Sequence, residues 1–174
     1  MIYTVEFDFE DFFDTPQIQI GIDGTVYYNQ SVQEQISFEA VLSNGPHTLW
    51  IQHWGKKIEW TTAEHDHHVF VKKIYFDNVD LDQLDYHPIT HKGRFYPDYE
   101  QSYRDTCQQQ NLTLPEYISP NHYLGHNGIW KLDFEAPELL WIIKEQNPSG
   151  IHLEDTIFST GSTTLNQVKK FFDL

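Results

Sequence analysis

Apolar and polar side chains alternate along residues 44–79, and this pattern constrains the fold of the chain more than any other feature. After an Asn-Gly-Pro turn, Leu49, Ile51 and His53 share one face of an extended segment, and the side chains between them share the other. A second alternating segment covers residues 69–76. Runs of branched and aromatic residues with a period of two, bounded by turn signals, are typical of antiparallel β-strands.

The same pattern predicts strands elsewhere in the chain. Residues 2–9 alternate, and an Asp-Gly pair at 23–24 separates two further alternating runs, which is a strong hairpin signal. Residues 36–42 and 129–134 alternate in the same way, and we expect the apolar run at 139–144 to be a late strand. Short strands at this spacing predict an all-β fold, an antiparallel β-sandwich or jelly roll.

The pattern divides the chain into a β-sandwich domain at 1–146 and a C-terminal arm at 147–174. Residues 85–128 are predicted to be a long insertion, because their polar and aromatic composition has no clear period. A short helix is expected inside the insertion at 97–111, where Pro97 suits a first helical turn and aromatic or cysteine residues recur every four positions. The arm is predicted to end in a short amphipathic helix.

Composition excludes several classes of function. The chain has 174 residues, of which 16% are aromatic, and a formal net charge of −15. The aromatic content indicates a folded domain, and the acidity argues against nucleic acid as a partner, because phosphate binding needs a basic face. A lone cysteine, Cys107, allows no intrachain disulfide, and the first residues lack the pattern of a signal peptide. Both features lead us to expect folding in a reducing cytoplasm. No apolar run approaches the roughly 20 residues that span a bilayer, so we expect no membrane partner.

The polar loop between the two strands of residues 44–79 holds the densest group of candidate metal ligands. Glu64 and Asp66 offer carboxylate oxygens, which suit calcium, and three neighbouring histidines offer imidazole, which suits zinc, nickel or copper. In an extended segment these side chains alternate between two faces, so they cannot all converge on one ion. Calcium bound by Glu64 and Asp66, a transition metal, and a polar loop without any metal are the three interpretations; no other cofactor is predicted.

Tryptophans flank the same loop and suggest a surface that binds a ligand. Trp54 and Trp60, beside Asp66 and His67, would form a platform for a sugar ring if the indoles are exposed. The alternative is that the tryptophans fill the core or are covered by the second half of the chain. The sequence contains no phosphate-binding loop, nucleophile elbow or HExxH motif, and it predicts no catalytic residue and no enzyme.

Three segments resemble the calcium-dependent xylan-binding modules, a jelly-roll family of carbohydrate-binding domains. They are residues 18–26 (IQIGIDGTV), 45–52 (GPHTLWIQ) and 66–79 (DHHVFVKKIYFDNV), and they follow one another in the family's order. The resemblance implies a jelly roll for the first half of the chain. It also implies that Asp66 lies where the family has a calcium ligand that contacts sugar hydroxyls, although the glycines that usually precede this aspartate are absent.

The chain as a whole resembles the small virion structural proteins of tailed bacteriophages, notably those of cyanobacterial phages. The segments that carry this resemblance are residues 93–100 (GRFYPDYE), 123–134 (YLGHNGIWKLDF) and 153–161 (LEDTIFSTG). The resemblance implies a non-enzymatic component of a tail, baseplate or capsid decoration, located in the virion and made in the host cytoplasm. Its partners would be copies of itself or other virion proteins.

These observations lead to three hypotheses of function. The first is the structural component of a phage particle, which would assemble through its sandwich surface and its C-terminal arm. The residues of the arm expected to mediate assembly are Leu165, Val168, Phe171 and Phe172. The second is a calcium-dependent module that binds host or environmental glycans through the tryptophan platform. The third, a metal-dependent sugar-modifying enzyme of the cupin type, is suggested by the histidines but lacks the further glutamate and histidine that a cupin needs.

Overall fold

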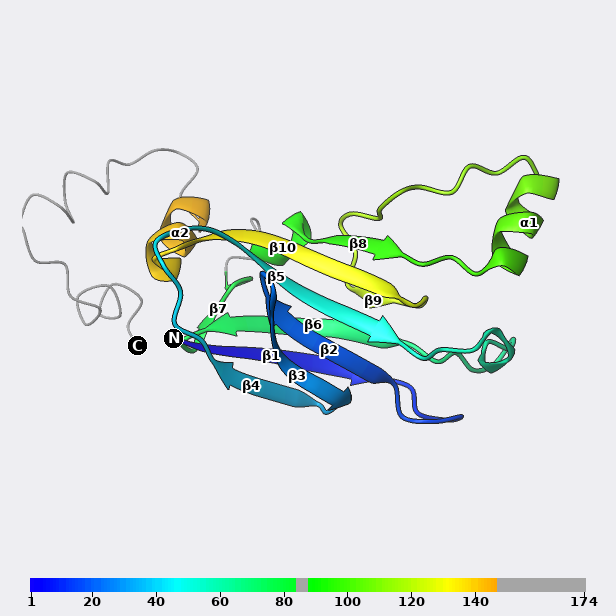
Figure 1. Ribbon diagram of the computed structural model, residues 1–174, viewed down its shortest axis with the longest axis horizontal. Helices are drawn as coiled ribbons and strands as arrows, with labels where there is room; N and C mark the ends of the chain where they lie inside the picture. The colour runs from blue at the N-terminus through cyan, green and yellow to red at the C-terminus, as the bar shows by residue number, and fades with distance from the viewer. Residues whose placement is uncertain (84–87, 147–174) are drawn as a thin grey trace, which may run out of the picture.

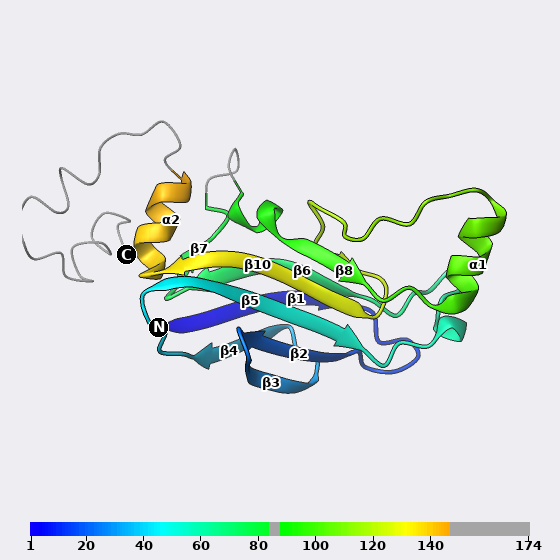
Figure 2. The same ribbon diagram turned by 45° about the horizontal axis from the view of Figure 1, so that its top comes forward.

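In the computed structural model, which describes residues 1–83 and 88–146, the chain is an antiparallel β-sandwich. Figures 1 and 2 show two layers of strands with the two α-helices at opposite ends. Sheet A has the order β4–β1–β6–β7 with β9 paired to β6, and its strands are β1 (Ile2–Phe9), β4 (Gln35–Glu39), β6 (Val69–Phe76), β7 (Val79–Asp80) and β9 (Tyr123–Leu124). Sheet B has the order β3–β2–β5–β10–β8, and its strands are β2 (Gln17–Ile22), β3 (Thr25–Ser31), β5 (Gly45–Trp54), β8 (Arg94–Pro97) and β10 (Gly128–Ala136). The helices are η1 (Ile58–Trp60), η2 (Ile89–Lys92), α1 (Gln101–Gln109) and α2 (Glu138–Gln146).

Alternation along the strands separates the core from the outer faces, as the sequence predicts. In β5, Leu49, Ile51 and His53 are buried between the sheets, whereas Trp50 and Trp54 lie on the outer face of sheet B. Trp54 is 40% exposed, so the interpretation that the tryptophans fill the core is wrong for this residue. Burial of each large apolar side chain in the core contributes about 1.5–3 kcal/mol to folding.

The predicted hairpin at the Asp-Gly pair is confirmed between β2 and β3. Asp23 has a positive φ of 50°, a conformation that aspartate adopts more readily than most residues. Its carboxylate accepts the backbone N–H of Thr48 at 2.9 Å and pairs with His47 Nδ1 at 2.7 Å. These bonds tie the hairpin to the start of β5.

The insertion predicted at 85–128 contributes strands to both sheets. Within its described part, β8 forms an edge of sheet B and β9 pairs with β6 in sheet A. The helix predicted at 97–111 is confirmed as α1, over a shorter span. With four and two residues, β8 and β9 are too short for a period to be recognised in the sequence.

The strand predicted at 139–144 is wrong, because these residues belong to helix α2. A short, continuous apolar run fits a buried strand or a buried helix equally well. Pro137 decides between them, since proline suits the first turn of a helix, and its carbonyl accepts the N–H groups of Leu140 at 3.1 Å and Trp141 at 3.2 Å. Neither described α-helix has the length and apolar character needed to cross a membrane. The predicted C-terminal arm and its assembly residues lie outside the described residues.

Tyr3 of β1 links α2 to the core. Its hydroxyl donates a hydrogen bond to the carboxylate of Glu138, and both residues are buried. Burial, and then the bond to Glu138, raises the pKa of Tyr3, so the phenol stays protonated and remains a donor. The Tyr3 ring also packs against Phe76 and Phe134, with centroid distances of 4.9 and 6.3 Å. The first strand and the last described helix are therefore joined through one polar contact inside an aromatic cluster.

Tyr3→Phe is expected to lower the free energy of unfolding by about 1–3 kcal/mol, because Glu138 loses a buried hydrogen-bond donor. Denaturant unfolding of the variant and the parent protein measures this loss. The double variant Tyr3→Phe/Glu138→Leu leaves no unpaired carboxylate, so it should recover most of the stability. Equal stability of Tyr3→Phe and the parent protein would show that the contact contributes nothing.

Candidate functional site

A cleft of about 380 Å³ lies at the end of the sandwich opposite α2. Segments far apart in the sequence form its walls: the loop after β5, the segment from β8 into α1, the residues around β9, and the turn before β10. The residues that line the cleft are Lys56, Ile58, Thr61, Asp66, Phe95, Asp98, Glu100, Tyr103, Ile118, Asn121, Tyr123, Gly125, His126 and Asn127. Aromatic, charged and amide side chains therefore meet in one hollow.

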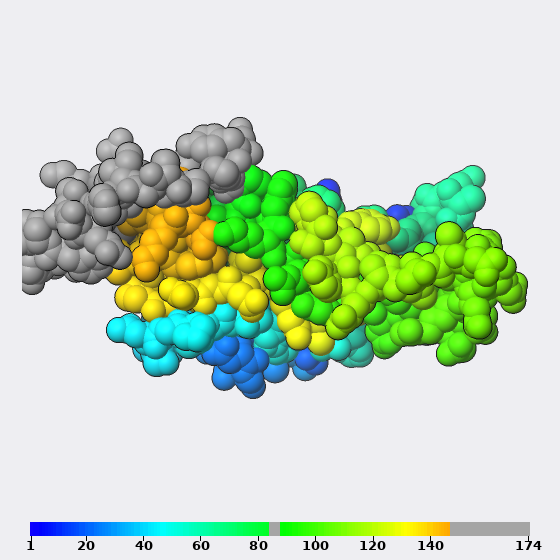
Figure 3. Space-filling model, turned by 90° about the horizontal axis from the view of Figure 1, so that it is seen from above, coloured from blue at the N-terminus to red at the C-terminus, as the bar shows by residue number. Residues whose placement is uncertain are grey.

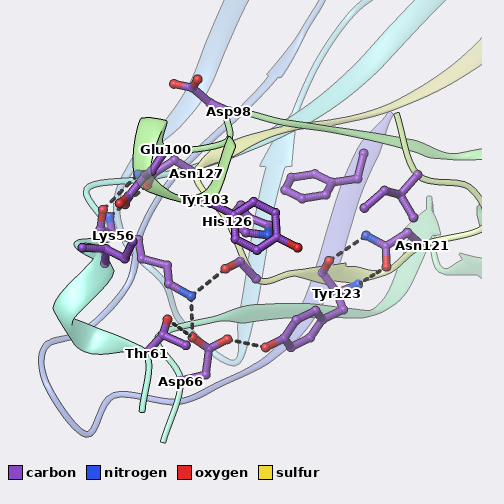
Figure 4. Close-up of a pocket in the computed structure, with 14 residues that line it drawn as sticks. Lys56, Thr61, Asp66, Asp98, Glu100, Tyr103, Asn121, Tyr123, His126 and Asn127 are labelled. Carbon is purple, nitrogen blue, oxygen red and sulfur yellow. Dashed lines mark hydrogen bonds and ion pairs between the residues drawn. The ribbon is translucent and has the colours of Figure 1, made fainter. Parts of the chain in front are cut away.

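The carboxylate of Asp66 is the centre of the hydrogen-bond network in the cleft (Figure 4). It accepts hydrogen bonds from Lys56 Nζ, from the Tyr123 hydroxyl and, at 2.7 Å, from Thr61 Oγ1. Lys56 Nζ also donates to the carbonyl of Gly125 at 2.6 Å. Burial alone raises the pKa of Asp66, but the hydrogen bonds from Lys56, Tyr123 and Thr61 outweigh it and lower the pKa to about 2. Asp66 is therefore an anion at neutral pH, and Lys56 balances its charge.

Glu10, at the end of β1, holds the loop that carries Asp66. Its carboxylate accepts the backbone N–H of Asp66 at 3.0 Å and pairs with His65 Nδ1 at 2.7 Å. The hydrogen bond from the Asp66 N–H is the main reason that the pKa of Glu10 is lowered. The His65 ring stacks on Phe12, with the centroids 3.8 Å apart. The backbone of this loop is thus fixed on one side, while the Asp66 side chain points into the cleft on the other.

Of the residues that the sequence suggests as ligands, only Asp66 lines the cleft. His67 is 2% exposed and lies inside the molecule, with its ring 5.4 Å from His53 and 4.6 Å from Trp60. Trp54 faces outward from the end of β5, and Glu64 is exposed. The structure brings His67 and Trp60 together, but neither residue lines the cleft.

The metal interpretations find little support in this arrangement. Among residues 1–83 and 88–146, no three or more histidine, cysteine or acidic side chains are grouped so that they could hold a metal ion. The rings of His53 and His67 stack on each other, with the centroids 5.4 Å apart and an inclination of 23°. Both oxygens of Asp66 already accept hydrogen bonds, and a calcium ion there would have to displace Lys56. Calcium binding by Glu64 and Asp66 stays a prediction.

His53 connects the core of sheet B to the wall of the cleft. Its Nδ1 lies 3.0 Å from the carbonyl of Leu124 and 3.1 Å from that of His126, so this nitrogen carries the proton and donates. The other nitrogen of His53 is buried without a hydrogen-bond partner in the described part of the chain. Burial, and then the nearby His67, lowers the pKa of His53 to about 4. Both imidazoles are neutral at physiological pH, because burial also lowers the pKa of His67.

Most of the cleft comes from residues that the sequence did not suggest. Asn127 forms a reciprocal pair with the backbone of Lys56, in which its Oδ1 accepts and its Nδ2 donates at 2.9 Å each. The ring of Tyr103, on α1, lies 5.1 Å from that of His126. Burial, and then the positive charge of Lys56, lowers the pKa of His126, so this imidazole is neutral as well. The only sequence signal for these residues is the polar and aromatic composition of the insertion.

The cleft is suited to a small polar ligand with several hydroxyl groups. Tyr103 is 41% and Tyr123 is 42% exposed, so part of each side chain is open to the apolar face of a ligand. Asp98 and Glu100 add carboxylates at the start of α1, and Asn121 adds an amide. Lys56 and Asp66 neutralise each other at its base, whereas Asp98 and Glu100 leave the cleft acidic, which favours a ligand that donates hydrogen bonds and carries no negative charge.

The chain matches none of the family models, curated proteins and solved structures with which it was compared. A functional assignment therefore rests on the geometry of its own residues.

Acid is expected to destabilise the fold through His53 as the pH falls from 6.5 toward 4. In this range the unfolded chain binds a proton at His53, whose ordinary pKa is 6.5, and the folded chain, with a pKa of about 4, does not. The contribution of His53 to the free energy of unfolding is therefore complete above pH 6.5, and on the order of 3 kcal/mol is lost by about pH 4. Asp66 stabilises the fold at higher pH, and it adds to the acid destabilisation only at lower pH, as the pH falls from 3.8 to about 2.

Denaturant unfolding at a series of pH values measures this slope. His53→Gln keeps a side-chain donor for the two carbonyls but does not titrate, so its free energy of unfolding should vary less over the same range. His91→Gln, which changes an exposed histidine, is the matched control and should keep the slope of the parent protein. If the free energy of unfolding falls as steeply with pH in His53→Gln as in the control, His53 is not the cause of the acid destabilisation.

Proposed function

We propose that the protein is a non-catalytic carbohydrate-binding module and that its cleft binds a sugar without a metal ion. The observation that carries the proposal is the pairing of partly exposed tyrosine side chains with fixed hydrogen-bonding groups in one hollow. A sugar ring has an apolar face that packs on an aromatic ring and hydroxyl groups that need donors and acceptors. Tyr103 and Tyr123 supply the rings, and Asn121, Asp98 and Glu100 supply polar groups around them.

Lys56 takes the place that a cation would have in this site. Its ammonium group contacts Asp66 and the Gly125 carbonyl, which are the kinds of oxygen atom that bind calcium. The positive charge at the base of the cleft is therefore part of the chain, and sugar binding needs no added ion. In the alternative, calcium-dependent form of the hypothesis, Asp66 and Glu64 would bind the ion and Lys56 would have to move away.

Tyr103→Ala is expected to weaken glycan binding about tenfold, because it removes an aromatic face of the cleft. Tyr103 is 41% exposed, so the substitution should not disturb the fold. A glycan array identifies the ligand, and calorimetry with the best neutral oligosaccharide measures the affinity. The matched control is Tyr75→Ala, which removes a tyrosine from β6 in the other sheet.

The same titrations with EDTA separate the two forms of the hypothesis. Binding that persists in EDTA supports the role given to Lys56, and binding that EDTA abolishes would return Asp66 and Glu64 to the role of calcium ligands. A parent protein that binds no glycan on the array would contradict the proposal in both forms.

A second candidate function is that of a structural component of a phage particle, and an exposed apolar patch favours it. The end patch consists of Phe12, Phe13, Ile58 and Trp60, from the loop after β1 and from η1. Phe12 is 62% exposed, and Phe13 stacks against Trp60 with the centroids 6.4 Å apart. Exposed aromatic and aliphatic groups of this kind mark surfaces that bind other proteins. In a virion the patch would contact other virion proteins or another copy of the chain, and the cleft beside it would face host glycans.

Phe12→Ser/Ile58→Ser is expected to shift the protein from an oligomer to a monomer, because it makes the two most exposed residues of the end patch polar. Light scattering of the eluting protein measures the mass. The matched control is Val41→Ser, which changes an exposed valine in the loop before β5. A monomeric parent protein, or an oligomer that the double substitution leaves intact, would contradict assembly through this patch. Deletion of residues 164–174 tests the predicted assembly role of the C-terminal arm separately.

A further inference from the structure

A second hollow lies on the outer face of sheet B, and β8 separates it from the cleft. Its volume is about 390 Å³, and it is lined by Asp23, Thr48, Trp50, Lys92, Arg94, Tyr96, Lys131 and Asp133. Side chains alternate along β8, so Phe95 lines the cleft while Arg94 and Tyr96 line the second hollow. Figure 3 shows the green surface of the segment that contains β8 next to the yellow surface of β10, which borders the cyan surface of β5.

The aromatic floor of this hollow is fixed by the sheet beneath it. Gly21 lies opposite Trp50 on the neighbouring strand, and any Cβ at this position would collide with the Trp50 ring. The indole therefore lies over β2, where its Nε1 donates to the carbonyl of Asp23 at 2.8 Å. Tyr96 adds a second ring, which lies 5.1 Å from the ammonium group of Lys131. These contacts hold the floor in place before any ligand arrives, which reduces the entropy lost on binding.

Positive charge gathers around this floor, on a chain with a net charge of −15. Lys92 pairs with Glu145. Within the described residues, Arg94 and Lys131 have no carboxylate at ion-pair distance and instead lie over tyrosine rings, at 5.5 and 5.1 Å. Both cations can therefore bind an anionic group of a ligand without breaking an ion pair.

Two carboxylates at the same hollow limit the kind of anion that fits. Asp133 accepts a hydrogen bond from the Thr48 hydroxyl at 2.7 Å through one of its oxygens, which leaves the other able to accept from a ligand hydroxyl. Asp23 is held by Thr48 and His47 and keeps a negative charge at the opposite side. Carboxylates beside cations suit a ligand with both hydroxyl groups and an acidic group, and they repel a chain of phosphates.

We propose that this hollow is a second glycan subsite and that it selects an acidic sugar. The ring of the sugar would pack against Trp50 and Tyr96, its carboxylate or sulfate group would bind Arg94 and Lys131, and a hydroxyl group would donate to Asp133. The inference rests on the proposed function as a carbohydrate-binding module and adds the class of sugar that the outer face of sheet B recognises.

Arg94→Gln/Lys131→Gln tests the subsite in the full chain. Binding to galacturonate, a single sugar with one carboxylate, and to galactose 6-sulfate, a single sugar with one sulfate, should each be measured by calorimetry, and the preferred probe identifies the anionic group. The double substitution is expected to weaken binding of the preferred probe about tenfold or more, because it removes charged hydrogen bonds. It should leave binding of a neutral oligosaccharide unchanged, whereas Tyr103→Ala should weaken only the neutral ligand.

The matched control is Lys72→Gln/Lys73→Gln, which removes two positive charges from β6 in the other sheet. A control that loses as much affinity for the acidic probe as the test variant would show a general charge effect and overturn the subsite. An acidic probe that still binds the test variant with full affinity, or duplex DNA that binds the parent protein as tightly as the probe, would overturn it too. Binding of neutral but not acidic glycans defeats this inference alone, and binding of no glycan defeats the proposed function as well.

Discussion

The antiparallel ladder between β5 and β10 is the interaction on which both candidate sites depend. Because Gly128 pairs with His53 at one end of the ladder, the loop after β5 and the turn before β10 emerge side by side. Asn127 can then bond to the backbone of Lys56, and Lys56 can reach Asp66. A shift of one residue in this register would turn every side chain of β10 to the opposite face and remove both the core and the sites.

Inside the cleft, the ion pair between Lys56 and Asp66 matters more for geometry than for stability. An isolated pair near the surface contributes little to the free energy of folding, because desolvation offsets most of the attraction. This pair is linked to Thr61, Tyr123 and the Gly125 carbonyl, so it joins the loop after β5 to the segment around β9. Such a network holds its donors and acceptors in one arrangement, which lowers the entropy that a ligand must lose on binding.

Strands were predictable wherever one face is buried over at least five residues, because burial imposes the period of two. The hairpin was predictable from Asp23, whose positive φ is common for aspartate in such turns. Helix α2 was not, since five consecutive apolar residues carry no period and the distinction rests on Pro137 and on packing against β10. Asp66 was the one cleft residue suggested by the sequence. Its partners could not be found, because Lys56 and Tyr123 come next to it only through the pairing of β6 with β9 and of β5 with β10.

The acidity of the chain itself sharpens the selectivity of the second hollow. A net charge of −15 repels any long polyanion, and at about 0.1 M salt this repulsion acts over about 10 Å from each surface charge. A single acidic sugar seated between Arg94 and Lys131 meets mainly the charges that touch it, and these are attractive or hydrogen-bonding. A nucleic acid would place further phosphates over Asp23, Asp133 and the acidic surface beyond them. Two cations on an acidic face can therefore bind one anionic group strongly, while the rest of the surface disfavours a ligand with a row of anionic groups. A face that was basic throughout would bind both kinds of ligand and would lose this selectivity.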